Sequence, residues 1–95
     1  MQIEYSKITD KTKIIDIRSS LDFASDGIPN SINVPRLILL SNPDLYMNKR
    51  DSYYLICDKG TISLSCVKIL NALGFNCYSI IGGIDGIKKI GFNKK

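Results

Sequence analysis

The sequence contains no histidine and only three cysteines, so it lacks the residues of the common zinc sites. Cys57, Cys66 and Cys77 stand nine and eleven residues apart, which is not the spacing of paired zinc ligands. Three cysteines cannot all pair within one chain, and reduced thiols are the simplest expectation. We therefore expect neither a metal nor another cofactor.

The chain also lacks a long apolar run and a signal-peptide pattern. No segment approaches the length of a membrane span, and Met1 is followed by a polar, mixed stretch. These absences predict a soluble, cytoplasmic protein with no membrane partner. With 95 residues, 44% of them hydrophobic, we expect a single domain over residues 1–95 with a small core.

The aromatic and arginine-rich interleaving typical of a nucleic-acid surface is missing too. The net charge is nevertheless +4 and the pI is near 9.0, with positive residues paired at 49–50, 88–89 and 94–95. Solvated lysines that aid solubility explain this pattern better than a nucleic-acid partner does. A mild attraction for small anions stays open.

What the chain does contain is a strand–loop–helix stretch over residues 53–73, around which the other segments are arranged. Tyr53–Ile56 is apolar and β-prone, as expected of a strand covered on both faces, and Cys57 ends it. Residues 58–61 predict a turn in which Gly60 can adopt a positive φ. Gly74 is well placed as the residue that ends the following helix.

Helical spacing begins after this turn. The predicted helix has an apolar face made of Ile62, Cys66, Leu70 and Leu73, flanked by Val67 and Ile69. A loop that leads into a helix N-terminus presents unpaired backbone N–H groups, which favour an anion. A cysteine at this position is favoured as a thiolate nucleophile. The alternative, that Cys57 is a small apolar residue closing a core strand, is equally open on this stretch alone.

Shorter segments on either side alternate between strand and helix. Strands or short extended segments are expected over residues 1–5, 14–17, 31–35 and 75–81. A short helix capped by Ser19 or Ser20 is expected over residues 21–24, and a helix or packed loop over residues 36–40. A last helix is expected to carry Ile84, Ile87 and Ile90 on one face and to end at Gly91. This alternation predicts an α/β fold, a three-layer sandwich whose central, mostly parallel sheet is flanked by short helices. Ligands of such sheets bind beyond the carboxyl ends of the strands, where Cys57 falls.

Asp16 and Arg18 form a second candidate feature. They are two residues apart in an extended segment, so their side chains start on the same side. A carboxylate inside an apolar strand needs partners. A structural role, in which Asp16 accepts hydrogen bonds from loop N–H groups or from an arginine, is favoured over a catalytic one.

Five segments, taken in order, carry a resemblance to a known family: IIDIR at 14–18, GIPNSINVP at 27–35, LICDKG at 55–60, LGFNCY at 73–78 and IGGI at 81–84. Together with Phe23 they resemble a single-domain rhodanese over nearly the whole chain. The resemblance implies a sulfurtransferase whose active cysteine is Cys57. This cysteine would take the outer sulfur of a donor such as thiosulfate, become a persulfide, and pass the sulfur to cyanide or to a thiol acceptor, including a protein thiol.

The resemblance also implies roles for the residues around Cys57. The substrate-binding loop would consist of Asp58, Lys59, Gly60, Thr61, Ile62 and Ser63, with backbone N–H groups wrapped around the persulfide. Asp16 and Arg18 would brace the loops around the site without touching sulfur.

The chain departs from the family pattern at several positions. Asp26 and Gly27 stand where the family often has Gly-His, and Ile87 lies in the region of a frequent tryptophan. Ile62 stands where many active members carry an arginine, which leaves Lys59 as the sole cation of the loop, while Asp58 opposes a negative donor. We therefore expect a persulfide of a protein or a small thiol to be a better donor than thiosulfate.

Two other functions compete with sulfur transfer. A dual-specificity phosphatase or arsenate reductase needs an arginine six positions after the cysteine, where this chain has Ser63, so the bidentate oxyanion clamp is missing. A non-catalytic rhodanese-like binding module, or a carrier that holds sulfur for a partner, stays open. Cys66 and Cys77 are expected to be buried structural thiols and not resolving cysteines.

Overall fold

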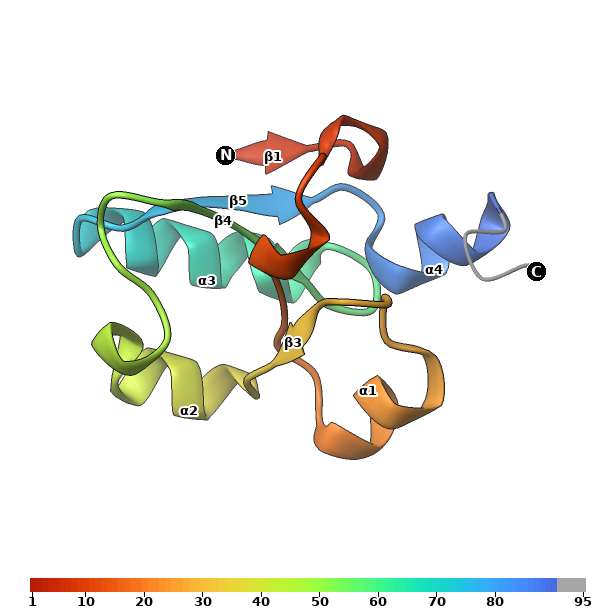
Figure 1. Cartoon of the computed structure of the whole chain (residues 1–95), viewed down its shortest axis with the longest axis horizontal. Coiled ribbons are helices and arrows are strands. Elements are labelled where there is room, and N and C mark those ends of the chain that lie inside the picture. Colours follow the sequence, from red (N-terminus) through yellow and green to blue (C-terminus); the bar gives the residue numbers. More distant parts are fainter. Residues whose placement is uncertain (91–95) are drawn as a thin grey trace.

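The computed structural model describes residues 1–90, which form short strands and helices in alternation (Figure 1). The strands are β1 (Gln2–Ile3), β2 (Ile14–Asp16), β3 (Ile32–Asn33), β4 (Ser52–Ile56) and β5 (Asn76–Ile80). The helices are α1 (Ser20–Asp26), α2 (Arg36–Ser41), α3 (Thr61–Ala72) and α4 (Gly83–Lys89), with 3-10 turns η1 (Tyr5–Lys7), η2 (Lys11–Lys13) and η3 (Pro43–Leu45).

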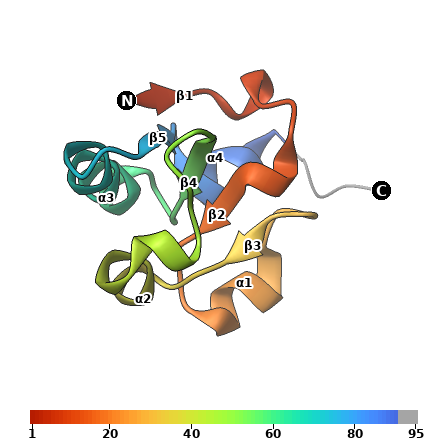
Figure 2. The same ribbon diagram turned by 60° about the vertical axis from the view of Figure 1, so that its left-hand side comes forward.

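The five strands form one sheet in the order β1-β5-β4-β2-β3, and every pairing is parallel. Figure 2 shows α2 and α3 on one side of the sheet and α4 on the other. The predicted three-layer α/β sandwich is therefore confirmed, with a wholly parallel sheet among the described strands. Parallel strands require crossover connections, which explains why helices separate most of them along the chain.

Two hydrophobic clusters cover the two faces of the sheet, and β4 alternates between them. Tyr53, Leu55 and Cys57 belong to the cluster under α2 and α3, whereas Tyr54 and Ile56 belong to or pack against the one under α4. This alternation is the period of two expected of a strand. The prediction of a central strand covered on both faces is confirmed.

The predicted apolar face of α3 is wrong at both ends. Ile62 and Leu73 are about half exposed, at 52% and 51%. The buried face consists of Ser63, Cys66, Val67 and Leu70. The polar Ser63 belongs to this buried face because its hydroxyl forms a hydrogen bond with the buried Ser79 of β5. Gly74, at φ +100°, follows the C-cap as predicted.

The remaining elements agree with the sequence to within a residue or two. β2 ends at Asp16, one residue earlier than expected, and residues 36–41 form a helix and not a loop. Ser19 caps α1, accepting a hydrogen bond from the Asp22 N–H. Ile84 and Ile87 are buried, but Ile90 is 70% exposed because α4 stops at Lys89. The predicted helix end at Gly91 lies outside the described residues.

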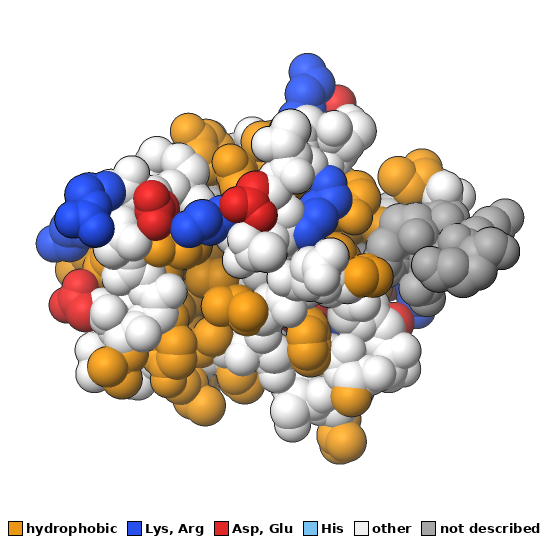
Figure 3. All heavy atoms as spheres, in the orientation of Figure 1, with side chains coloured by type: hydrophobic (Ala, Val, Ile, Leu, Met, Phe, Trp, Pro, Cys, Tyr) orange, Lys and Arg blue, Asp and Glu red, His pale blue; other side chains and the backbone are white. Residues whose placement is uncertain are grey.

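The surface carries exposed apolar side chains as well as charges. Figure 3 shows hydrophobic side chains spread over the lower part of the molecule, where Figure 1 places α1 and α2. Leu37 of α2 and Leu45 of η3 are among the most exposed. Over residues 1–90, no helix is both long and apolar enough to span a bilayer.

Candidate active site

Cys57 lies at the carboxyl edge of the sheet, in the loop that joins β4 to α3. Its Sγ accepts hydrogen bonds from two backbone N–H groups, those of Gly60 at 3.2 Å and Ser63 at 3.3 Å. Gly60 adopts φ +98°, the left-handed conformation that folds its N–H back toward the sulfur. The turn predicted from Gly60 is thus present, and it surrounds the sulfur with donors.

Buried hydroxyl groups extend this environment behind the sulfur. Ser63 Oγ lies 3.2 Å from Cys57 Sγ and 2.7 Å from Ser79 Oγ, which in turn lies 3.3 Å from the Gly60 carbonyl oxygen. Both serines are fully buried. Because hydroxyl groups rotate, Ser63 can accept from a Cys57 thiol or donate to a thiolate without moving its oxygen.

The front of Cys57 opens into a small pocket. Cys57, Asp58, Lys59, Thr61 and Ile62 line this hollow of about 160 Å³. A larger hollow of about 300 Å³ is lined by Glu4, Tyr5 and Ser6 together with Ile81, Gly82, Gly86, Ile87 and Ile90, and no cysteine is among these residues. The pocket at Cys57 is therefore the better candidate for chemistry. No cluster of histidine, cysteine and acidic side chains suited to a metal ion forms within residues 1–90.

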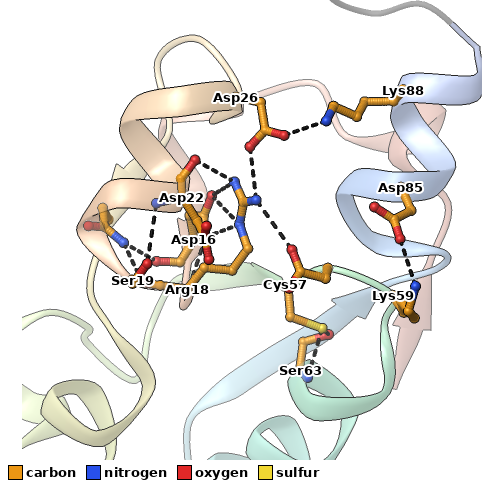
Figure 4. A network of polar contacts seen from close by, with 12 residues as sticks. Asp16, Arg18, Ser19, Asp22, Asp26, Cys57, Lys59, Ser63, Asp85 and Lys88 are labelled. Atoms are coloured by element: carbon orange, nitrogen blue, oxygen red, sulfur yellow. Dashed lines mark hydrogen bonds and ion pairs between the residues drawn. The ribbon is translucent and has the colours of Figure 1, made fainter.

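Arg18 is the centre of a buried ion-pair network next to this pocket (Figure 4). Its Nη2 lies 2.9 Å from Asp16, and its Nη1 lies 2.9 Å from Asp26 and 3.3 Å from Asp58. Burial opposes the positive charge of Arg18, but the hydrogen bonds that the guanidinium donates to Asp16 and Asp26 outweigh it, so the pKa of Arg18 is raised. The network joins the end of β2, the end of α1 and the Cys57 loop.

Two further ion pairs tie α4 to the same region. Lys88 lies 2.6 Å from Asp26, and its hydrogen bond is the main cause of a lowered pKa of that carboxyl group. Lys59 lies 3.0 Å from Asp85, which raises the pKa of the lysine. Both charged residues predicted to line the loop, Asp58 and Lys59, are therefore already paired.

The first turn of α4 is hydrogen-bonded to the loop that follows Cys57. The N–H groups of Ile84 and Asp85 donate to the carbonyl oxygens of Cys57 and Asp58, at 2.9 and 3.0 Å. A Cβ atom on Gly83 would lie only 2.5 Å from both carbonyl oxygens. A glycine at this position lets the two segments approach so closely.

All the residues predicted to form the site meet in this region. Asp58 to Ser63 surround Cys57, and Asp16 with Arg18 stands behind the loop. Sequence reasoning missed Asp26, Ser79, Gly83 and Asp85. The Gly-Gly pair at 82–83 was a signal of close approach, whereas nothing in the local sequence marked Ser79 or Asp85 as partners of the loop.

Cys66 and Cys77 are buried, as predicted, and all three cysteines are free thiols. Burial raises the pKa of the Cys66 thiol, and it raises that of Cys77 to about 12.

Comparisons with known proteins agree with this architecture. Residues 2–90 match the model of the rhodanese-like domain family. The chain is 35% identical over 72 residues to the adenylyltransferase and sulfurtransferase uba4 of Ogataea parapolymorpha, covering 75% of this chain but 18% of that protein. The chain therefore spans less than a fifth of the length of this relative.

Solved structures give the same result. A rhodanese-related protein from Thermoplasma volcanium matches with a TM-score of 0.77 and 29% identity, over 83% of this chain and 78% of its own. A protein from Staphylococcus saprophyticus matches with a TM-score of 0.75 and 29% identity, over 86% and 78% of the two chains. The parallel sheet, the loop around Cys57 and these matches together place the chain in the rhodanese-like domain family.

Proposed function

We propose that this chain is a sulfurtransferase in which Cys57 carries a sulfane sulfur between a donor and a thiol acceptor. The observation that supports this most strongly is the set of donors around Cys57 Sγ: two backbone N–H groups at 3.2 and 3.3 Å and the Ser63 hydroxyl at 3.2 Å. Such preorganised donors stabilise negative charge on sulfur without a separate base.

The proposed transfer has two steps. The Cys57 thiolate, having lost its proton to solvent, attacks the outer sulfur of the donor, and a new S–S bond forms. The bond between that sulfur and the rest of the donor breaks, and its electron pair leaves with the thiolate or sulfite product. An acceptor thiolate, or cyanide, then attacks the terminal sulfur and releases the Cys57 thiolate. No external oxidant or reductant is needed.

The two buried serines fit both states of the sulfur. With a thiol, Cys57 donates to Ser63, Ser63 donates to Ser79, and Ser79 donates to the Gly60 carbonyl group. With an anionic sulfur, Ser63 turns to donate to it and accepts from Ser79. Ser79 thus acts as a positioning residue for Ser63.

The donor we propose is the persulfide of a small thiol or of a protein, in preference to thiosulfate. Lys59, the cation of the loop, is paired with Asp85, and Asp58 is paired with Arg18. A doubly charged donor therefore finds no free cation within the loop.

A carrier that holds the persulfide but turns over slowly by itself is the second candidate, and the paired charges of the loop favour it over a phosphatase. Ser63 supplies no bidentate clamp for a tetrahedral oxyanion.

Intact-protein mass spectrometry tests the proposal. The chain is treated with thiosulfate or with a small-thiol persulfide, with and without cyanide, beside a Cys57→Ser variant. We expect the wild-type chain to gain the mass of one sulfur atom and to lose that sulfur when cyanide is added. The Cys57→Ser variant should gain no sulfur. A wild-type chain that takes sulfur from neither donor, or a variant that still transfers it, contradicts the mechanism. If the bound sulfur is removed rapidly by cyanide but is transferred slowly to thiols, the result supports the carrier function.

A further inference from the structure

Both charged side chains that line the Cys57 pocket are engaged in ion pairs. Asp58 lies 3.3 Å from Arg18, which also holds Asp16 and Asp26, and Lys59 lies 3.0 Å from Asp85. A donor that carries a carboxylate or a sulfonate beside its sulfur therefore finds no unpaired cation among the five residues that line the pocket. Binding such a donor would require a cation from outside the loop.

Arg36 begins α2 at the same edge of the sheet. Its N–H donates to the Ile17 carbonyl oxygen at 3.0 Å, and the N–H of Ile17 donates to the Ile56 carbonyl oxygen at 3.0 Å. Cys57 is the next residue after Ile56. Two backbone hydrogen bonds therefore connect the start of α2 to the end of the strand that carries Cys57.

Arg36 is an exposed residue in the first turn of α2. Arg36 shares a face with Leu39 and Leu40, three and four positions later. Leu39 is fully buried, and Leu40 packs against the hydrophobic cluster that contains Cys57 and Cys66. Helical side chains tilt toward the helix N-terminus, so we expect the Arg36 side chain to lean toward the start of α2, which lies at the carboxyl edge of the sheet.

Electrostatics agrees with this placement. Burial raises the pKa of the Cys66 thiol, the positive charge of Arg36 opposes that rise, and Cys57 adds to it. Arg36 and Cys57 therefore both act through space on the same sulfur. Cys66 stands one helical turn after Ile62, which lines the pocket.

The Arg36 guanidinium has no competing partner within residues 1–90. It takes part in none of the ion pairs, its side chain donates no hydrogen bond there, and it is exposed to solvent. A free guanidinium offers several donors in a planar fork that matches carboxylate and sulfonate oxygens.

We propose that Arg36 binds the anionic group of the sulfur donor: the carboxylate of a small-thiol persulfide, or the sulfonate of thiosulfate. This inference rests on the proposed function and names the residue that binds those donors that carry an anionic group beside the transferable sulfur. Arg36 makes and breaks no bond. It holds the part of the donor that departs, with the electron pair, when Cys57 takes the outer sulfur.

The first test measures binding without transfer. Thiosulfate is titrated into the Cys57→Ser chain by NMR or calorimetry, and the dissociation constant is compared after adding Arg36→Gln, Arg36→Lys or Arg50→Gln. We expect Arg36→Gln to weaken binding by about fivefold, because an ion pair exposed to solvent contributes about 1 kcal/mol. Arg36→Lys should recover part of the lost affinity for thiosulfate. Arg50→Gln, which removes the same charge from an exposed position before β4, should leave it within about twofold.

The second test compares two donors in chains that retain Cys57. Thiosulfate carries a sulfonate, whereas the persulfide of 2-mercaptoethanol carries no charged group beyond its sulfurs. We expect Arg36→Gln to raise KM for thiosulfate with little change in kcat. We expect the same variant to leave both constants unchanged for the persulfide of 2-mercaptoethanol.

Equal effects of Arg36→Gln and Arg50→Gln on binding would overturn the assignment, as would equal slowing with both donors. A wild-type chain that takes sulfur from neither donor would instead contradict the proposed function. The titration on the Cys57→Ser chain would still decide whether Arg36 binds the anion.

Discussion

The Nη1 atom of Arg18 lies 3.3 Å from Oδ1 of Asp58, forty residues further along the chain, and so joins the end of β2 to the residue beside Cys57. The same guanidinium holds the fully buried Asp16 and the partly buried Asp26. We expect Arg18→Ala to lower the free energy of unfolding by about 3–5 kcal/mol, because it leaves the buried Asp16 carboxylate without its ion-pair partner, whereas Asp26 keeps Lys88. Denaturant unfolding measures this.

Asp58→Asn is the matched control for that variant. The Asp58 side chain is 62% exposed, so losing its charge should change stability by no more than about 1 kcal/mol. Equal losses in the two variants would show that Arg18 does not stabilise the fold through its buried partners.

Ser79→Ala is expected to impair the Cys57 loop while leaving the sheet intact. The substitution removes the partner of the Ser63 hydroxyl and of the Gly60 carbonyl group inside the core. A buried polar group left unsatisfied costs about 1–3 kcal/mol. We expect slower persulfide formation at every pH, because the Ser63 hydroxyl loses the partner that orients it toward Sγ. Stopped-flow rates across pH measure it.

The control for Ser79 is Ser65→Ala, on the exposed side of α3, where the hydroxyl donates to the Ile62 carbonyl group. A full rate in Ser79→Ala, or the same deficit in both variants, would remove Ser79 from the positioning of Ser63.

Gly83→Ala and Gly86→Ala form a matched pair in α4. At Gly83 a new Cβ would lie 2.5 Å from the Cys57 and Asp58 carbonyl oxygens, and φ is +61°. We expect a loss of about 1–3 kcal/mol and a displaced loop. At Gly86 the nearest atom is 3.8 Å away, so alanine should be tolerated or slightly stabilising. Thermal unfolding and the rate of Cys57 alkylation measure both; similar results for the two variants would contradict the close approach at Gly83.

The three thiols should differ in reactivity. Cys77 has a pKa of about 12, and burial raises that of Cys66. Both should stay protonated and unreactive toward iodoacetamide at neutral pH, so that the native chain gains one label, on Cys57, and the unfolded chain three. Peptide mapping after labelling locates the modified residue. Labelling of Cys66 or Cys77 in the native chain would contradict their burial.

The raised pKa of Cys77 makes the free energy of unfolding depend on pH in the alkaline range. The Cys77 thiol keeps its proton in the folded chain up to a pKa of about 12, whereas the unfolded chain loses it near the ordinary value of 9.0. Stability should therefore be fully present below pH 9 and fall as pH rises from 9 toward 12. Urea unfolding at several alkaline pH values measures the slope. Cys77→Val should flatten it, and an unchanged slope in that variant would contradict this assignment.

The sequence by itself determined the order of strands and helices, the place of Cys57 at the carboxyl end of a central strand, and the shared side of Asp16 and Arg18. These features are local. A short segment is enough to show a hydrophobic period of two or of three to four residues. It also shows a glycine at a turn, or an acidic residue two positions from an arginine.

Only the tertiary structure decided the rotation of α3, which turns Ser63 inward and leaves Ile62 and Leu73 half exposed, because that rotation depends on where Ser79 lies in β5. The same holds for Asp26 and Gly83, which lie in α1 and α4 and meet the Cys57 region only in the folded chain. Contacts between segments so far apart in the chain produce no periodic pattern in the sequence.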